Sequence, residues 1–284
     1  MEMFQNTENK VCLENFSLAQ ICQSGQCFRM EKIREHVYSV IAGGRYLEIE
    51  QEGAQSIFHC GKEEYENFWK SYFDIERDYG AYVRQIDTGD AYLTAAAAFG
   101  SGIRILRQDL WEMIVTFLIS QQNNIARIRR CVSNICEKYG ERRESAEGIV
   151  YYTFPTPEAL AGPGEDALME CNLGYRSKYV VRSAKSVLSG ELDLDALYKM
   201  SYPEAKETLL GLYGVGNKVA DCVCLFALHH LQAVPVDTHI LQAFSRHYPA
   251  GFPDVLYDGY QGVLQQYIFY YELFGGDSSS AFAL

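Results

Sequence analysis

The sequence predicts an α+β fold, with an N-terminal antiparallel β-sheet domain over residues 1–90 and a mainly α-helical domain over residues 91–284. Three observations lead to this prediction. Short runs of strand-forming residues surround a pair of glycines near residue 43. Beyond residue 63, apolar residues recur at the three- and four-residue spacing of a helix face. Near residue 214, two helical segments are separated by a short glycine-rich turn.

The β elements come first along the chain. Segments 37–41 and 45–50 flank the sequence Ala-Gly-Gly, which is typical of a β-hairpin closed by a glycine turn. Segment 56–60 is expected to extend the hairpin as another short strand.

The helical elements follow from about residue 63 almost to the C-terminus. Asp109 precedes the apolar run 110–119 and is suited to cap a buried helix there. Residues 125, 128, 132, 135 and 139 are apolar or aromatic and fall on one face of the next helix. Thr156 lies between two prolines in a loop that leads into a further helix.

The composition is that of an ordinary globular protein, with 48% hydrophobic and 22% charged residues. No apolar stretch is long enough to span a bilayer and no N-terminal leader is evident, so we expect a cytoplasmic protein without membrane contact. The nine cysteines show no CxxC spacing and the six histidines no HExxH pattern. We therefore expect reduced, mostly buried thiols and no metal bound by side chains.

The net charge of −12 argues against a protein that is drawn to nucleic acid by long-range attraction. Two local basic clusters remain, namely Arg127, Arg129 and Arg130, and Arg176, Lys178 and Arg182. A DNA contact made by a few arginines and backbone amides is compatible with an acidic total, but steering at a distance should be weak.

The most informative stretch runs from residue 209 to residue 240. A helix is expected to end near Leu210, and a second helix is expected to begin at Asn217 after the turn 211–216. Gly214 and Gly216 permit positive φ and close approach of another backbone. The amides at the start of the second helix would suit a DNA phosphate, although a plain helix–helix corner explains the glycines equally well.

Lys218 lies in the first turn of that second helix. The positive end of the helix dipole disfavours a charged ammonium there, and a neutral amine is what nucleophilic attack on a sugar carbon requires. The alternative is that Lys218 only contacts a phosphate as a charge. Cys222 is four residues further on, so it shares the Lys218 face and would line the same pocket, or else is a small core residue.

Asp237 stands immediately before the apolar helical segment 240–244, after an extended Val-Pro-Val entry. It is expected to be the N-cap of that helix. A capping carboxylate held beside a nucleophilic lysine would also stabilise positive charge that develops on a ribose ring.

These motifs resemble the helix-hairpin-helix superfamily of DNA glycosylases, and the wider chain resembles the 8-oxoguanine DNA glycosylase/AP lyase family. The similarity extends over most of the chain. The blocks that carry it are Ser24-Gly-Gln-Cys-Phe-Arg29, Leu106-Arg-Gln-Asp109, Gln122-Asn-Asn-Ile-Ala-Arg-Ile128, Leu173-Gly-Tyr-Arg176 and Gly214-Val-Gly-Asn-Lys-Val-Ala-Asp-Cys222.

The resemblance implies an enzyme whose nucleophile is Lys218 and whose catalytic carboxylate is Asp237. The carbonyl of Gly25 would accept a hydrogen bond from N7–H, which 8-oxoguanine carries and guanine lacks. The flipped base would stack between Cys222 and Phe269, with Gln265 bonding its Watson–Crick edge. Gln265 and Phe269 are four residues apart on one predicted helix, so they would face one pocket.

The resemblance also implies contacts to DNA. Tyr175, Arg127 and Arg176 match residues that wedge the duplex and read the cytosine left behind. Phosphate contacts are expected from the amides of Gly214, Gly216 and Val219 and from the His239 side chain. Extruding a base costs a few kcal/mol, so such wedges and clamps are needed.

Two positions depart from the family pattern. The wedge block begins with Gln122 where the family usually has Asn, and the hairpin has Tyr213 in place of its usual proline. We expect the hairpin to persist, because Tyr213 removes no amide. No cysteine cluster follows Cys224, so an iron–sulfur cluster is not expected.

The expected partner is double-stranded DNA containing 8-oxoguanine opposite cytosine, bound by a monomer that needs no cofactor. A monovalent or divalent cation at the carbonyls of Leu210, Leu212 and Val215 is a further expectation from the family. Two alternatives stay open: a monofunctional alkylated-base DNA glycosylase, which would lack Lys218, and a non-catalytic helix-hairpin-helix module, which would need neither Lys218 nor Asp237.

Overall fold

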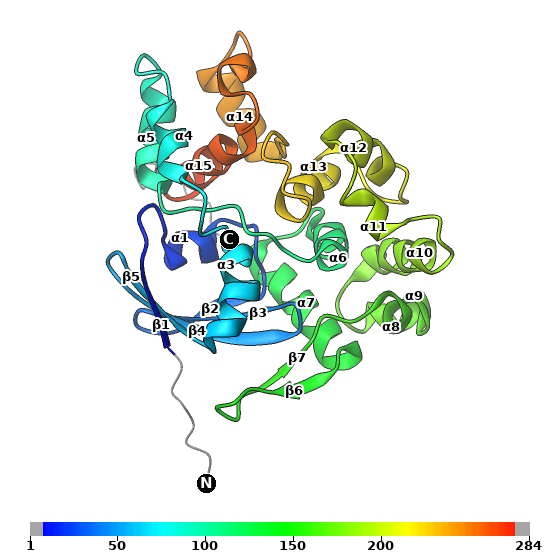
Figure 1. Cartoon of the computed structure of the whole chain (residues 1–284). Coiled ribbons are helices and arrows are strands. Elements are labelled where there is room, and N and C mark those ends of the chain that lie inside the picture. Colours follow the sequence, from blue (N-terminus) through cyan, green and yellow to red (C-terminus); the bar gives the residue numbers. More distant parts are fainter. Residues whose placement is uncertain (1–7, 276–284) are drawn as a thin grey trace.

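The computed structural model describes residues 8–275, which form an antiparallel sheet followed by helices (Figure 1). The five-stranded sheet has the order β1-β5-β4-β3-β2. Its strands are β1 (Glu8–Cys12), β2 (Met30–Arg34), β3 (Val37–Ala42), β4 (Arg45–Glu52) and β5 (Gln55–His59). The predicted hairpin is β3–β4, turning at Gly43 and Gly44 with φ of +54° and +71°, and the predicted third strand is β5. β1 and β2 were not predicted.

One face of the sheet is covered by its own small core. Leu47 and Ile49 on β4 and Phe58 on β5 are fully buried, as the period of two along a strand requires. They pack with aromatic residues such as Trp69. Trp69 lies in the helical segment that follows the sheet, which consists of α2 (Lys62–Glu64), η1 (Tyr65–Trp69) and α3 (Lys70–Tyr72). Figure 1 shows this helical segment, in cyan, lying across the sheet.

The helical part begins with α4 (Tyr79–Arg84) and α5 (Ala91–Gly100) and continues through α6 (Leu110–Ser120) and α7 (Ile125–Tyr139). Asp109 caps α6 by accepting a hydrogen bond from the Glu112 amide at 2.8 Å, so this predicted cap is confirmed. The helix expected after Thr156 is α8, and Thr156 caps it by accepting from the Ala159 amide. The remaining helices are α8 (Pro157–Ala161), α9 (Gly164–Met169), η2 (Gly174–Arg176), α10 (Ser177–Leu188), α11 (Leu194–Leu197), α12 (Tyr202–Leu210), α13 (Asn217–Phe226), α14 (Thr238–His247), η3 (Asp254–Tyr257) and α15 (Gln261–Phe274).

A second, small hairpin interrupts the helices and was not predicted. It pairs β6 (Arg142–Glu144) with β7 (Val150–Tyr152). The expectation of continuous helical structure after residue 63 is therefore wrong at this point. β6 is entirely exposed and highly charged, so it has none of the apolar alternation by which a strand is predicted.

The helices share one large core that brings distant segments together. α15 packs along α5, and α13 packs against both α6 and α12. α1 (Leu18–Gln23) carries the chain from β1 back to β2 and lies between the sheet and α15 (Figure 1). Within residues 8–275, no helix is long and apolar enough to cross a membrane.

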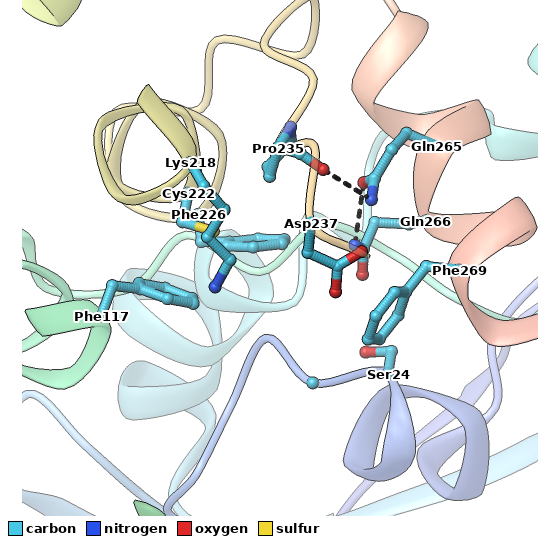
Figure 2. A pocket seen from close by; sticks show the side chains of 11 residues that line it. Ser24, Phe117, Lys218, Cys222, Phe226, Pro235, Asp237, Gln265, Gln266 and Phe269 are labelled. Atoms are coloured by element: carbon cyan, nitrogen blue, oxygen red, sulfur yellow. Dashed lines mark hydrogen bonds between the residues drawn. The ribbon is translucent and has the colours of Figure 1, made fainter. Parts of the chain in front are cut away.

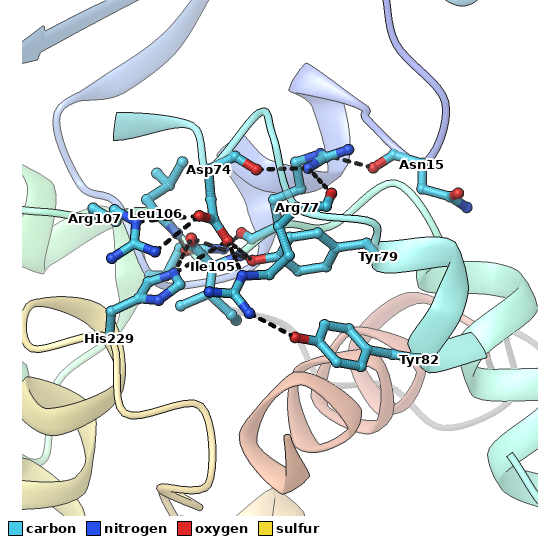
Figure 3. A network of polar contacts seen from close by, with 11 residues as sticks. Asn15, Asp74, Arg77, Tyr79, Tyr82, Ile105, Leu106, Arg107 and His229 are labelled. Atoms are coloured by element: carbon cyan, nitrogen blue, oxygen red, sulfur yellow. Dashed lines mark hydrogen bonds and ion pairs between the residues drawn. The ribbon is translucent and has the colours of Figure 1, made fainter. Parts of the chain in front are cut away.

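Buried polar residues join the sheet to the helices (Figure 3). The Arg104 guanidinium is 4% exposed and donates hydrogen bonds to backbone carbonyls of Glu14, Asn15, Asp74 and Arg77. The Asp74 carboxylate in turn accepts from Arg77 and Arg107 and lies 3.4 Å from the His229 ring nitrogen. These contacts fix the relative positions of the sheet, the helical part and the loop after α13.

The predicted boundary between the two domains at residue 90 stays a prediction. The outer ends of the two predicted domains, residues 1–7 and 276–284, lie outside the described residues. The two cores interleave in sequence: Phe28 and Tyr79 belong to the large helical core, whereas Leu106 belongs to the core of the sheet.

Candidate active site

The hairpin between α12 and α13 forms as predicted, with Tyr213 in the place of the usual proline. Gly214 has φ of +92°, and a Cβ atom there would lie 2.5 Å from the ring of Tyr179, so only glycine fits. Gly216 is different: its φ is −108°, so it does not use the positive φ that glycine permits. No atom lies within 4 Å of where a Cβ on Gly216 would be, so the Cα of Gly216 is open on that side.

Lys218 extends from the first turn of α13 into a pocket between α13, α14, α15 and the loop after α1 (Figure 2). Its Nζ donates to Ser120 Oγ at 3.4 Å and lies 5.1 Å from the centre of the Phe117 ring. Ser120 and Phe117, both on α6, thus contact the amine at one wall of the pocket.

Asp237 reaches the same pocket from the start of α14. Its Oδ1 accepts from the Ile240 amide at 2.9 Å, so the predicted N-cap is confirmed. Its Oδ2 lies 3.5 Å from Nδ1 of His239. Capping holds the carboxylate in one rotamer while its other oxygen stays on the pocket side.

Cys222 lies one turn after Lys218 on α13 and also lines the pocket, as the four-residue spacing predicts. The side chain is almost fully buried. Burial raises the pKa of the Cys222 thiol to about 11, against the opposing effect of Lys218. The thiol is therefore protonated at neutral pH and offers an apolar, polarisable surface.

Gly25 forms the floor of the pocket, and its φ is +73°. The neighbouring Gln26 fixes this loop from inside the protein. The Gln26 side chain donates to the carbonyl of Arg104 and accepts from the amide of Leu106, both at 2.9 Å, and Gln108 donates to its backbone carbonyl at 2.8 Å. The segment before α6 thus positions the Gly25 peptide opposite α15.

Gln265 and Phe269 extend from one face of α15 into the pocket, as predicted from their spacing. Figure 2 shows Lys218 and Cys222 on one side of the pocket, Gln265 and Phe269 on the other, and Asp237 between them. The cavity is about 40 Å³ and opens to solvent. Its lining also includes residues that were not predicted: Ser24, Phe117, Phe226, Pro235 and Gln266.

The residues expected to contact DNA outside the pocket differ in exposure. Gln122 and Arg127 are exposed, and Tyr175 is 43% exposed. Arg176 is only 3% exposed, and its guanidinium donates to the carbonyls of Gln121 and Gln122 at 2.8 Å each. Arg176 therefore braces the turn that presents Gln122.

Gln122 itself has a strained backbone. Its φ is +48°, a conformation that Asn adopts more readily than Gln. The bonds from Arg176 hold the turn in this shape, and the Tyr175 hydroxyl lies 3.5 Å from the Gln122 side chain. Gln122, Tyr175 and Arg176 thus form one assembly, and Arg127 follows in the first turn of α7.

The expected phosphate contacts gather around the start of α13. The Val219 side chain is buried, so only its backbone amide is available for such a contact. His239 is half-buried beside Asp237, on the first turn of α14. Tyr213 is 47% exposed at the tip of the hairpin, and the Arg182 guanidinium lies 4.0 Å from the centre of its ring.

Family models match most of the chain. Residues 10–114 match the N-terminal domain of 8-oxoguanine DNA glycosylase, and residues 115–252 match the HhH-GPD superfamily of base excision DNA repair proteins.

Curated relatives agree with these matches. An N-glycosylase/DNA lyase of Saccharomyces cerevisiae is 38% identical over 158 residues, which are 52% of this chain and 42% of the relative. The N-glycosylase/DNA lyase OGG1 of Arabidopsis thaliana is 30% identical over 77% of this chain and 62% of its own length. The chain thus spans less than two thirds of either relative.

A solved structure matches at nearly full length. The 8-oxoguanine glycosylase/lyase of Clostridium acetobutylicum, in complex with double-stranded DNA containing cytosine opposite 8-oxoG, is 36% identical with a TM-score of 0.84. The match covers 91% of this chain and 92% of that chain. The chain belongs to the 8-oxoguanine DNA glycosylase/lyase family, within the helix-hairpin-helix superfamily of base excision repair proteins.

Proposed function

We propose that this protein is a bifunctional DNA glycosylase/AP lyase that excises 8-oxoguanine opposite cytosine from duplex DNA. One observation carries the proposal: the Lys218 amine and the Asp237 carboxylate line a pocket that Cys222 and Phe269 also line, beside the hairpin. This arrangement supplies a nucleophile, a group that stabilises positive charge, and two surfaces for a flipped base.

In the proposed reaction, the Nζ of Lys218 attacks C1′ while the bond from C1′ to the base breaks. The base leaves with the bonding electron pair and takes up a proton that the amine has lost. Asp237 stabilises the positive charge on the sugar during this step. The sugar ring then opens to a Schiff base, loss of a C2′ proton expels the 3′ phosphate, and water hydrolyses the Schiff base to free Lys218.

The remaining proposed roles are contacts to substrate. Gly25 would read N7–H through its carbonyl, Cys222 and Phe269 would stack on the base, and Gln265 would bond its Watson–Crick edge. Gln122, Arg127 and Tyr175 would fill the vacated space and read the opposite cytosine, and Arg176 would support this by holding the turn that presents Gln122. Backbone amides of Gly214, Gly216 and Val219, with His239, would hold phosphates.

Lys218 supplies the nucleophile, which supports a reaction without a cofactor. A cation at the hairpin carbonyls of Leu210, Leu212 and Val215 remains a proposal. Of these carbonyls, that of Leu212 already accepts a hydrogen bond from the Val215 amide at 3.1 Å. We also propose that the protein acts as a monomer. The proposed location is the cytoplasm, at the nucleoid in a bacterium.

Borohydride trapping tests the proposal. Wild-type protein incubated with an 8-oxoguanine duplex and borohydride should form a covalent protein–DNA adduct, and Lys218→Gln should form none. Lys185→Gln is the matched control, because Lys185 is exposed on α10 away from the pocket. No adduct with the wild type would refute the lyase, and an undiminished adduct with Lys218→Gln would refute the assigned nucleophile.

The two alternatives predict different results in the same assay. A monofunctional glycosylase would release the base without an adduct, and a DNA-binding module would do neither. The amine of Lys218, placed inside the pocket, favours the bifunctional enzyme over both.

A further inference from the structure

Three tyrosine rings form a row from the turn that presents Gln122 to the tip of the hairpin. The centre of the Tyr179 ring lies 5.8 Å from that of Tyr175 and 5.4 Å from that of Tyr213, and both pairs meet edge to face. Tyr179 also packs so closely on Gly214 that a Cβ atom there would collide with its ring. The row is therefore fixed relative to both the turn and the hairpin.

Two cations of α10 lie on this row. The Arg182 guanidinium lies 4.0 Å from the centre of the Tyr213 ring. The Nζ of Lys178 lies 5.4 Å from the centre of the Tyr179 ring and 5.8 Å from that of Tyr213. Lys178 and Arg182 are four residues apart on the helix, so they share one side of it. Contact with an aromatic face orients a cation without neutralising its charge.

The charges of these two cations are not compensated within the protein. Neither forms an ion pair with a carboxylate among residues 8–275, although the chain has 37 acidic side chains against 25 basic ones. Exposed cations elsewhere do form such pairs, for example Lys138 with Glu170 and Arg143 with Glu141. The two charges on α10 are thus available to an anion from outside the protein.

The position of the cations selects that anion. Lys218 must reach C1′ of the flipped nucleotide, so the hairpin amides just before Lys218 lie beside the strand that carries the lesion. Tyr213 directly precedes Gly214 in this hairpin, and Arg182 lies on the Tyr213 ring. A phosphate of the same strand is therefore the anion within reach.

We infer that Lys178 and Arg182 form a binding site for a backbone phosphate of the lesion strand, next to the phosphates proposed for the hairpin amides. The inference rests on the proposed function and deepens it. Arg182 offers the planar donor fork that suits a phosphate, and Lys178 adds a second charge. Tyr213 is a positioning residue, because its ring holds the guanidinium at the hairpin tip.

This site depends on the tyrosine at position 213. A proline there would offer no aromatic face to the guanidinium of Arg182. The site also answers the acidic balance of the chain. With a net charge of −12 the protein gains little from attraction at long range, whereas two oriented cations at the point of contact add affinity at short range.

The test measures affinity for a duplex that carries a tetrahydrofuran abasic analogue, which has no base to excise, from about 50 to about 300 mM salt. Each phosphate contact contributes about 0.9 to the slope of log affinity against log salt. Arg182→Gln and Lys178→Gln should each lower this slope by about 0.9 and weaken binding roughly 3- to 10-fold at about 150 mM salt. Unchanged slopes in both variants would overturn the inference.

Two further variants separate charge from position. Arg182→Lys keeps the charge and should keep the slope of the wild type. Tyr213→Leu removes the ring but neither charge, so it should weaken binding by about two- to fivefold with the slope unchanged. Wild-type affinity in Tyr213→Leu would overturn the positioning role of the ring.

Lys62→Gln is the matched control, because it makes the same change in total charge at an exposed site in α2, across the sheet from α10. Its slope should stay within about 0.3 of the wild type, since charges are screened beyond about 8 Å at physiological salt. An equal fall in Lys62→Gln and Arg182→Gln would overturn the inference, because total charge would then set the affinity.

Neutral methylphosphonate links, placed one at a time in either strand, identify the contacted phosphate. At one link of the lesion strand, wild-type binding should weaken roughly 3- to 10-fold and binding by Arg182→Gln less than about twofold, because the variant has already lost that contact. Such a link only in the opposite strand, or in neither strand, would overturn the assignment.

Urea unfolding shows whether each variant folds. Borohydride trapping of the wild type remains the test of the proposed function. Failed trapping together with the predicted slopes would refute the enzyme and leave the phosphate site standing. Normal trapping together with slopes that no variant changes would overturn the phosphate site alone.

Discussion

Gly25 and Phe269 face each other across the floor of the pocket: a Cβ atom on Gly25 would lie 3.1 Å from Cε1 of Phe269. The aromatic ring proposed to stack on the base thus rests on the peptide proposed to read it. Positive φ at Gly25 and this contact both require glycine. A change at either residue therefore displaces the other.

Gly25→Ala should lower discrimination between 8-oxoguanine and guanine more than it lowers affinity for the duplex. The added methyl group strains a left-handed backbone by about 1–2 kcal/mol and pushes the Phe269 ring. Gly53→Ala is the control, since Gly53 has φ of +58° but nothing within 4 Å of its Cβ position. Competition binding and excision rates provide the measurement. Equal losses of binding and of discrimination in Gly25→Ala would contradict the assigned role.

Asp237→Asn should retain the fold and most of the DNA affinity while excision slows by at least ~100-fold. Asn caps a helix as well as Asp does, so the bond to the Ile240 amide survives and only the charge is lost. Asp237→Ala removes the cap as well and should cost about 1 kcal/mol of unfolding free energy. Urea unfolding and single-turnover excision separate the effects. If Asp237→Asn unfolds as readily as Asp237→Ala, capping is the main role.

Arg176→Ala should destabilise the protein by about 1–3 kcal/mol, because it leaves the carbonyls of Gln121 and Gln122 without their buried donor. Arg127→Ala is the counterpart on an exposed residue and should change stability by less than about 0.5 kcal/mol. Both variants should weaken the preference for cytosine opposite the lesion, measured by excision opposite each of the four bases. Equal stability of the two variants would show that Arg176 does not brace the turn.

Local signals predicted much of the site. The N-caps at Asp109 and Asp237 follow from residue type and position, and Lys218 and Cys222 share a pocket because four residues make about one helical turn. The hairpin formed despite Tyr213 because its turn depends on the backbone of Gly214.

Other features depend on contacts between distant segments and could not be predicted. Gln265 and Gln266 are adjacent on a helix, where neighbours do not normally face each other, and only the Pro235 carbonyl aligns their amides. Arg176 looked like a surface cation but is buried by a turn more than fifty residues earlier in the chain. Arg182 and Tyr213 are far apart in the sequence, and only the fold places the Arg182 guanidinium against the Tyr213 ring at the hairpin.

The Asp74 carboxylate is the electrostatic centre of the junction between sheet and helices (Figure 3). Burial opposes its ionisation, but the hydrogen bond from His229 and the charges of Arg107 and Arg77 outweigh burial and hold the pKa of Asp74 well below its usual range. A carboxyl group whose pKa is lowered by folding stabilises the native state at every pH above its unfolded value. That stability is lost as the pH falls toward the folded value.

Asp74→Asn should therefore lower the unfolding free energy by about 3 kcal/mol at pH 7, because Arg107 and Arg77 lose a buried counter-charge. The gap to the wild type should shrink as the pH falls below about 4, where the unfolded carboxyl takes up a proton. Asp78→Asn is the matched control: Asp78 is exposed, and Asn can still cap α4, so its effect should be small at every pH. Urea unfolding from pH 3 to pH 8 measures the gap, and a gap that stays constant to pH 3 would show that the Asp74 charge does not stabilise the junction.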